Sequence, residues 1–139
     1  MRLIGVIGLP GCGKTSFFLE KEFEGFLKID DIGIDWTSNE AKISAAIQNN
    51  QSVLVSDIEF CDAHKRAEFE NHIGRQFEWI CFENAPMKCA VNSLHRYYSG
   101  AARPHVEELE KIVRLSKIYQ PFGEIRRVKV SGDALKRIL

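Results

Sequence analysis

The sequence predicts one α/β domain in which five parallel strands form a doubly wound sheet with helices on both faces. Short apolar runs alternate with segments of helical periodicity along the 139 residues, and this alternation is typical of a parallel sheet. No linker, internal repeat or low-complexity tract divides the chain, and a chain of this length builds one compact core. We therefore expect a single domain over residues 1–139.

Strands are expected at the short apolar runs, and helices where apolar residues recur every three or four positions. The expected strands are 2–7, 26–29, 52–56, 77–82 and 126–130. The expected helices are 14–23, 38–49, 62–74, 86–98 and 104–119, followed by a terminal turn or helix. Thr37 and Glu40 have the spacing of a capping box in front of the helix at 38–49.

The stretch GLPGCGKT, residues 8–15, fits the phosphate-loop pattern G-x-x-x-x-G-K-[ST] between an expected strand and an expected helix. Gly8, Gly11 and Gly13 are expected to give the backbone the freedom to wrap an anion. Lys14 would reach the β- and γ-phosphates, and the Thr15 hydroxyl would bind Mg²⁺. The pattern predicts an ATP and Mg²⁺ site made of Gly8, Leu9, Pro10, Gly11, Cys12, Gly13, Lys14, Thr15 and Ser16.

Acidic residues follow two other expected strands, at the edge of the sheet where such folds bind ligands. Asp30 and Asp31 follow the second strand, and Asp57, which is also a candidate Mg²⁺ ligand, follows the third. A kinase needs a carboxylate that accepts the proton of the acceptor hydroxyl, in addition to any carboxylate near the metal ion. Two acidic strand ends therefore favour a kinase. The alternative is that each aspartate caps a helix or forms a turn.

Residues 85–104 have the pattern of a helical lid. Pro86 suits a first helical turn, and Cys89, Asn92 and Arg96 recur at three- and four-residue spacing, so they share one face of that helix. A Gly-containing connection separates this helix from the next expected one. Arg96 and Arg103 lie near the two ends of this connection, and arginines over the γ-phosphate assist phosphoryl transfer. The alternative is an ordinary helical hairpin with two surface arginines.

The formal net charge is zero, but the charges are unevenly distributed. Residues 1–94 hold nine Lys and Arg against fourteen Asp and Glu, whereas residues 95–139 hold ten against five. A basic C-terminal third attracts nucleotides or nucleic acid if it faces the phosphate loop, and otherwise forms solvated helix faces.

The four cysteines show no metal-ligand spacing, so we expect reduced thiols and neither a disulfide framework nor a zinc site. The sequence contains no apolar stretch of the roughly 18 residues that a membrane span needs. It also shows no targeting peptide before the first expected strand. A cytoplasmic protein is therefore expected.

Five stretches taken together, GLPGCGKT, GFLKIDD, SVLVSD, NAPMKCAVNSLHR and ARPHVEEL, resemble the kinase domain of bacteriophage polynucleotide kinase and its small P-loop kinase relatives. The resemblance covers most of the chain. It implies transfer of the ATP γ-phosphate to the 5′-hydroxyl of a nucleic acid end. Asp30, or less favourably Asp31, would be the general base, and Asp57 would lie near the acceptor. Arg96 or Arg103 would be the lid arginine.

The sequence departs from the family where the acceptor is recognised. The family often has an arginine shortly after its Asp pair, where residues 32–35 here read IGID, and it commonly has Asp-Thr-Asn where residues 57–59 read Asp-Ile-Glu. Phe60, Tyr97 and Tyr98 would stack an unpaired base, or else pack in the core or the hinge. Three functions stay open: a nucleic-acid 5′-kinase, a kinase of a small molecule, and a nucleotide-dependent switch or ATPase.

Overall fold

The computed structural model of the protein describes residues 1–100 and 105–130, and five strands in them form one sheet of order β2-β3-β1-β4-β5. The strands are β1 (Leu3–Ile7), β2 (Leu27–Ile29), β3 (Val53–Ser56), β4 (Glu78–Phe82) and β5 (Glu124–Arg126). All neighbouring strands are parallel, and Gly5 at the centre of β1 lies opposite Val55 of β3 and Trp79 of β4. The predicted α/β sheet is confirmed.

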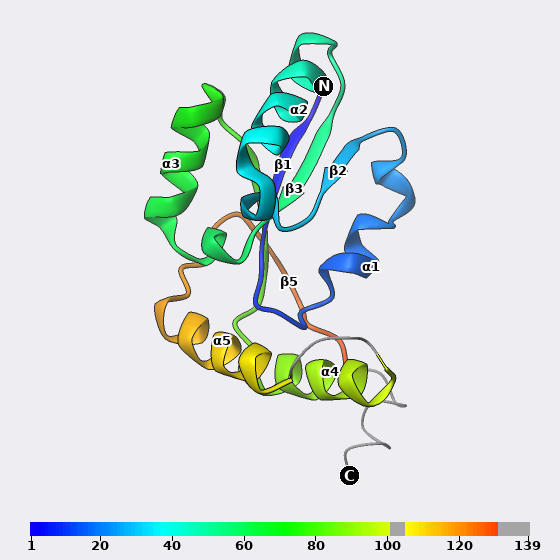
Figure 1. The fold of residues 1–139 in the computed structure, drawn as a ribbon, viewed down its shortest axis with the longest axis vertical. Helices are drawn as coiled ribbons and strands as arrows, with labels where there is room; N and C mark the ends of the chain where they lie inside the picture. The colour runs from blue at the N-terminus through cyan, green and yellow to red at the C-terminus, as the bar shows by residue number, and fades with distance from the viewer. Residues whose placement is uncertain (101–104, 131–139) are drawn as a thin grey trace.

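Helices cover both faces of the sheet, as the sequence predicts. Figure 1 shows α2 (Trp36–Gln48) and α3 (Ala63–Ile73) on one face and α1 (Lys14–Phe18) on the other. Two core clusters match these two layers, because alternate strand residues point to opposite faces. Leu3 and Ile7 of β1 belong to the cluster beside α2 and α3, whereas Ile4 and Val6 belong to the cluster beside α1.

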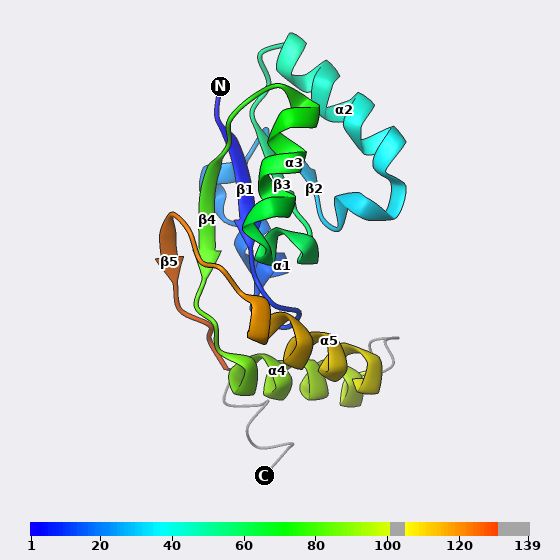
Figure 2. The same ribbon diagram turned by 90° about the vertical axis from the view of Figure 1, so that its left-hand side faces the viewer.

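A pair of helices lies across the carboxyl ends of the strands. Helices α4 (Pro86–Tyr98) and α5 (His105–Ile118) lie there in both ribbon views, and Figure 2 shows them side by side. Tyr119 follows α5, and its hydroxyl donates a hydrogen bond to the carbonyl oxygen of Phe82 at the end of β4. The helix pair is thereby attached to the edge of the sheet where the sequence predicts the ligand site.

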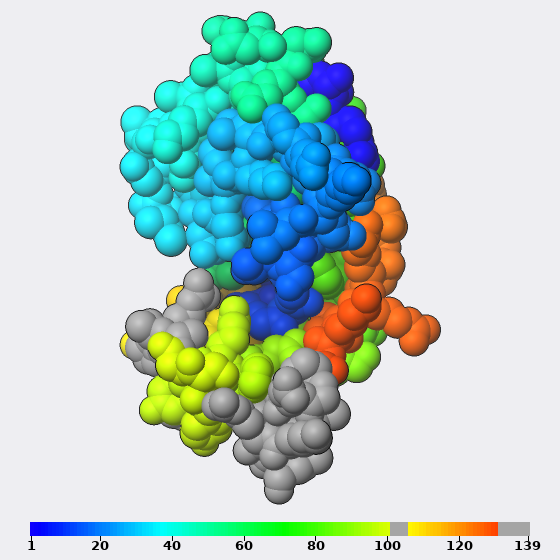
Figure 3. Space-filling model, turned by 90° about the vertical axis from the view of Figure 1, so that its right-hand side faces the viewer, coloured from blue at the N-terminus to red at the C-terminus, as the bar shows by residue number. Residues whose placement is uncertain are grey.

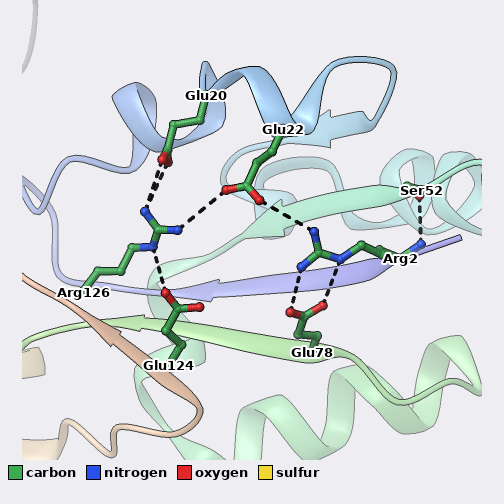
Figure 4. Close-up of polar contacts among 7 residues, drawn as sticks. All are labelled: Arg2, Glu20, Glu22, Ser52, Glu78, Glu124 and Arg126. Atoms are coloured by element: carbon green, nitrogen blue, oxygen red, sulfur yellow. Dashed lines mark hydrogen bonds and ion pairs between the residues drawn. The ribbon is translucent and has the colours of Figure 1, made fainter.

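The predicted helix at 14–23 is wrong in its length, because α1 ends at Phe18 and a separate 3₁₀ helix covers Lys21–Phe23. The segment that follows α1 is held to the sheet by ion pairs (Figure 4). Arg126 of β5 pairs with Glu20 and Glu22, and its guanidinium carbon lies 4.6 Å from the ring centroid of Phe17. These tertiary contacts outweigh the local helical periodicity.

The predicted capping box is also wrong. Helix α2 begins at Trp36, so Thr37 lies inside the helix, and the residue before the helix makes no capping hydrogen bond with its side chain. Trp36 packs edge-on against Phe69 and His72 of α3. Even a partly buried indole contributes more than a capping hydrogen bond, so this contact moves the helix start.

The last strand is shorter and earlier than the predicted 126–130. Beyond Arg126 the chain bonds to side chains instead of to β4: the Val128 amide donates to Glu83 Oε1 at 3.0 Å, and the Lys129 carbonyl accepts from Asn92 at 2.9 Å. The expected terminal turn or helix lies outside the described residues. No helix among residues 1–100 and 105–130 is both long and apolar enough to cross a membrane.

Candidate active site

A cleft of about 1160 Å³ lies at the carboxyl ends of the strands, between the phosphate loop and the helix pair. Figure 3 shows this hollow between the blue N-terminal segment and the yellow-green α4. The charged and polar side chains along its walls are Lys14, Thr15, Ser16, Asp30, Asp31, Asp57, Glu59, Asn92, His95, Arg96, Glu107, Glu108, Lys111 and Lys129. The cleft thus joins the predicted phosphate loop to both predicted acidic strand ends.

The phosphate loop has a backbone that only glycine adopts readily at two positions. Gly11 has φ 84° and Gly13 has φ 106°, both in the left-handed region. A Cβ at Gly11 would also overlap the carbonyl oxygen of Cys89, where α4 packs against the loop. The Lys14 ammonium donates a hydrogen bond to the Gly8 carbonyl at 3.3 Å, so the side chain folds back over the loop.

The residues of the predicted nucleotide site have different positions and roles. Gly11, Gly13, Lys14, Thr15 and Ser16 line the cleft together with Pro10. Leu9 and Cys12 are instead buried in the core and fasten the loop to the sheet. Gly8 does not use a left-handed φ, and its role is spatial, because a Cβ there would collide with the Cys12 sulfur.

The loop fits a nucleotide polyphosphate. Backbone amides in the first turn of a helix have no acceptor inside that helix, and Lys14 is the first residue of α1. Helix α1 has only five residues, so the attraction for an anion comes mainly from these amides and the ammonium and little from the helix dipole. The Thr15 hydroxyl lines the same cleft.

The described residues contain no group of three or more His, Cys, Asp or Glu side chains arranged to hold a metal ion. At a phosphate loop, phosphate oxygens and water supply most ligands of Mg²⁺ and the protein supplies few. The Thr15 hydroxyl, which lines the cleft, would contribute a ligand to such a site.

Asp30 lies at the mouth of the cleft beyond the end of β2, with an exposed side chain. The buried hydroxyl of Ser56, the last residue of β3, donates a hydrogen bond to Asp30 Oδ1. One carboxylate oxygen is thus held by the neighbouring strand. Asp31 also lines the cleft, and its backbone has φ 52°, a left-handed conformation that aspartate tolerates better than most residues.

Asp57 has a structural role in addition to its place in the cleft. It is only 8% exposed, and its Oδ2 accepts a hydrogen bond from the Gly33 amide at 2.9 Å. Its Oδ1 accepts from the Glu59 amide at 2.8 Å and so caps the 3₁₀ helix that follows β3. Asp57 therefore joins the segments that follow β2 and β3, as the capping alternative predicts, and its role as a metal ligand stays a prediction.

Helix α4 presents one face to the phosphate loop. The Asn92 amide nitrogen donates to the carbonyl oxygens of Gly11 and Lys129, both at 2.9 Å. Cys89, one turn earlier, lies against Gly11, and Arg96, one turn later, lines the cleft. The shared helical face of these three side chains is confirmed, and it places Arg96 at the site.

Arg96 is held by a carboxylate from α5. Its Nη2 lies 2.6 Å from Oε1 of Glu108, and Oε2 of Glu108 accepts a hydrogen bond from the Ser93 hydroxyl at 2.7 Å. Glu108 is 7% exposed and Ser93 is 1% exposed, so this polar group joins the two helices in their interface. The other predicted lid arginine, Arg103, lies outside the described residues.

The aromatic side chains proposed to stack a base have different positions. Phe60 is 3% exposed and packs against Phe69 and Trp79, with ring centroids 5.0 Å apart in each pair. Phe60 is thus a core residue, and its predicted contact with substrate is wrong. Tyr97 and Tyr98 are 43% and 59% exposed at the end of α4.

The four cysteines are buried free thiols, three of them close to the phosphate loop. Burial raises the pKa of the Cys12 thiol, and it raises the pKa of Cys61 and that of Cys89 to about 12. These three thiols are therefore protonated at neutral pH and pack as small apolar groups.

Sequence patterns missed several residues of the site. Asn92 was identified only by its helical face, and Ser56 and Glu108 were not identified. Ser56 directly precedes Asp57 at a strand end, which is a local signal for proximity to the site. Glu108 gives no local signal, because it meets Arg96 only when the two helices pack together.

Two solved structures share this fold. A gluconokinase from Sinorhizobium meliloti 1021 superposes with a TM-score of 0.60 at 15% identity, over 97% of this chain and 90% of that one. Kti12 from Chaetomium thermophilum, in complex with ADP-AlF3, superposes with a TM-score of 0.54 at 13% identity, over 99% of this chain and 95% of that one. No family model and no curated protein matches the sequence. The chain therefore has the P-loop kinase fold.

Proposed function

We propose that the protein is an ATP-dependent kinase that transfers the γ-phosphate to a hydroxyl of a small molecule. The main support for this proposal is that Lys14 and Thr15 of the phosphate loop line the same cleft as Asp30, which follows β2. A switch or simple ATPase does not need a second carboxylate placed to accept the proton of an acceptor.

In the proposed reaction, Asp30 takes the proton of the acceptor hydroxyl while its oxygen attacks the γ-phosphorus. The bond from that phosphorus to the β–γ bridging oxygen breaks, and ADP leaves. Lys14 and Arg96 balance the negative charge on the phosphoryl oxygens. Mg²⁺, bound through Thr15, would supply further charge balance on the phosphates.

The charges around the cleft favour an acceptor without phosphate groups. Asp30, Asp31, Asp57 and Glu59 line the part of the cleft formed by the ends of β2 and β3. A polyanion bound there meets like charges, which costs binding energy. One of the structures with this fold is named a gluconokinase, and that name also supports a small acceptor.

A nucleic-acid 5′-hydroxyl is the second candidate acceptor. The sequence resemblance favours it, and so do the exposed rings of Tyr97 and Tyr98, which lie 5.4 Å apart at the end of α4. The basic residues of the C-terminal third are divided, however. Lys111 and Lys129 line the cleft, whereas Arg114 and Lys117 lie beside an apolar groove on the outer side of α5.

The test is a transfer assay with γ-labelled ATP and Mg²⁺ against three groups of acceptors: sugars and polyols, free nucleosides, and 5′-hydroxyl oligonucleotides. We expect label on a small hydroxyl compound and no transfer with Lys14→Ala. Preference for a trinucleotide over its nucleoside, weakening as salt rises, would establish the nucleic-acid acceptor instead. Label released only as inorganic phosphate would refute kinase activity.

A further inference from the structure

Glu108 is a buried carboxylate in the wall of the proposed active site. It lies on α5, is 7% exposed, and binds two side chains of α4, the Ser93 hydroxyl and the Arg96 guanidinium. A buried carboxylate costs desolvation energy unless its oxygens are paired. The two contacts stabilise the charge, and together they fix the lateral position of α4 against α5.

The contact fixes the direction of the Arg96 guanidinium. This group is planar and rigid with five N–H donors, so an ion pair at Nη2 orients the whole plane. The Arg96 side chain is 39% exposed and lines the cleft, while its buried Nε has no hydrogen-bond partner among residues 1–100 and 105–130. A buried donor without a partner requires an explanation, and an anionic ligand in this cleft would provide one.

We propose that Glu108 is a positioning residue for phosphoryl transfer: it holds Nη2 of Arg96 so that the remaining guanidinium donors meet the γ-phosphoryl group during transfer. This inference rests on the proposed function. It predicts that Glu108 affects the binding of a transferring phosphoryl group and leaves the binding of ADP unchanged. If Glu108 only stabilised the fold, its substitution would weaken the binding of both ligands.

The experiment compares the affinity for MgADP alone with that for MgADP plus aluminium fluoride, by calorimetry. Aluminium fluoride with ADP imitates the phosphoryl group in transit, and Kti12 has been solved with this mimic. The variants are Glu108→Gln, which keeps the shape and the acceptor for Ser93, and Arg96→Lys, which keeps a cation for the buried carboxylate. Glu110→Gln on the exposed side of α5 is the matched control.

We expect Glu108→Gln to weaken the binding of the mimic about tenfold and ADP less than twofold, since one charge-assisted hydrogen bond is lost. The double variant with Arg96→Lys should bind the mimic as Arg96→Lys does alone, because in this proposal Glu108 acts on the phosphoryl group through Arg96. Additive losses would refute the proposal, and so would equal losses for ADP and the mimic or tighter mimic binding by Glu108→Gln. If the parent protein does not bind the mimic at all, both this inference and the proposed function are refuted. If binding of the mimic requires Lys14 but is unchanged by Glu108→Gln, this inference is refuted and the proposed function is not.

Discussion

The substitution Asp30→Asn tests whether the proposed base accepts a proton. Asparagine retains an oxygen that can accept the hydrogen bond from Ser56, so the side chain should keep its orientation at the end of β2. What it loses is the ability to take a proton. General base catalysis contributes about 10²–10⁴ in rate, equivalent to about 2.7–5.5 kcal/mol of activation free energy.

The substitution Ser56→Ala tests orientation separately from proton transfer. It removes the hydrogen bond to Asp30 Oδ1 and leaves the carboxylate in place. A hydrogen bond to a charged group contributes about 1.5–3 kcal/mol, and the lower value applies because Asp30 is exposed. We therefore expect Ser56→Ala to lower kcat by about tenfold, clearly less than Asp30→Asn.

The assay is kcat and KM for ATP with the acceptor identified by the transfer screen, together with the dissociation constant of MgATP. The reasoning is refuted if Asp30→Asn lowers ATP affinity as much as it lowers kcat, because Asp30 would then act on the nucleotide or the fold. The same change at Asp31 shows whether the neighbouring carboxylate is the base. Asp35→Asn, an exposed aspartate outside the cleft, is the control.

The other predictions concern the loop, the joint between β2 and β3, and the thiols. Lys14→Ala should weaken ATP binding by more than about tenfold and abolish transfer, because the polyphosphate loses its cation. Calorimetry measures the change in ATP affinity, and Lys21→Ala, at an exposed position, is the control. If the variant retains turnover within about tenfold of the parent, the assignment of the phosphate loop is wrong. Asp57→Asn should lower the free energy of unfolding by about 1–3 kcal/mol in urea titrations, because the new side-chain amide nitrogen faces one of the two backbone N–H groups that donate to Asp57. An unchanged urea midpoint would mean that these two hydrogen bonds do not contribute to stability. The native protein should react with a thiol reagent at pH 8 far more slowly than the unfolded one, because burial keeps Cys12, Cys61 and Cys89 protonated. Their folded-state pKa values lie above the ordinary thiol value of 9.0, so the unfolded state loses these protons first and the free energy of unfolding should fall as the pH rises above about 9. Rapid labelling of these three thiols in the native state would contradict their burial.

Periodicity and strand-end positions predict most of this fold, because they are properties of single segments. The buried run at β1 and the glycine pattern after it identify the loop without any knowledge of the rest of the chain. The errors arise where tertiary contacts override a local pattern. Trp36 moves the start of α2 by packing on α3, and Glu83 takes the Val128 amide that would otherwise extend β5.

In the candidate site, as in the fold, the residues that belong to a local sequence pattern were predictable. Lys14, Asp30 and Arg96 each follow from a local pattern, and all three line one cleft. Phe60 was placed wrongly, because position after a strand end does not show whether a ring points outward or into the core. Glu108 was missed since its partner lies twelve residues away on another helix.

The strand order explains why the two sides of the cleft differ in charge. With β1 at the centre of β2-β3-β1-β4-β5, the segments after β2 and β3 lie on one side of the phosphate loop. They carry Asp30 and Asp57, whereas α4 and the segment after β5 bring Arg96 and Lys129 from the other side. In the proposed reaction, phosphate charge is balanced from the β4 and β5 side, and the acceptor enters from the β2 and β3 side. An acceptor that carries its own phosphates would need cations on the acidic side, and the described residues at the ends of β2 and β3 that line the cleft provide none. A small hydroxyl compound requires no such cations, and it is the acceptor that this distribution of charge favours.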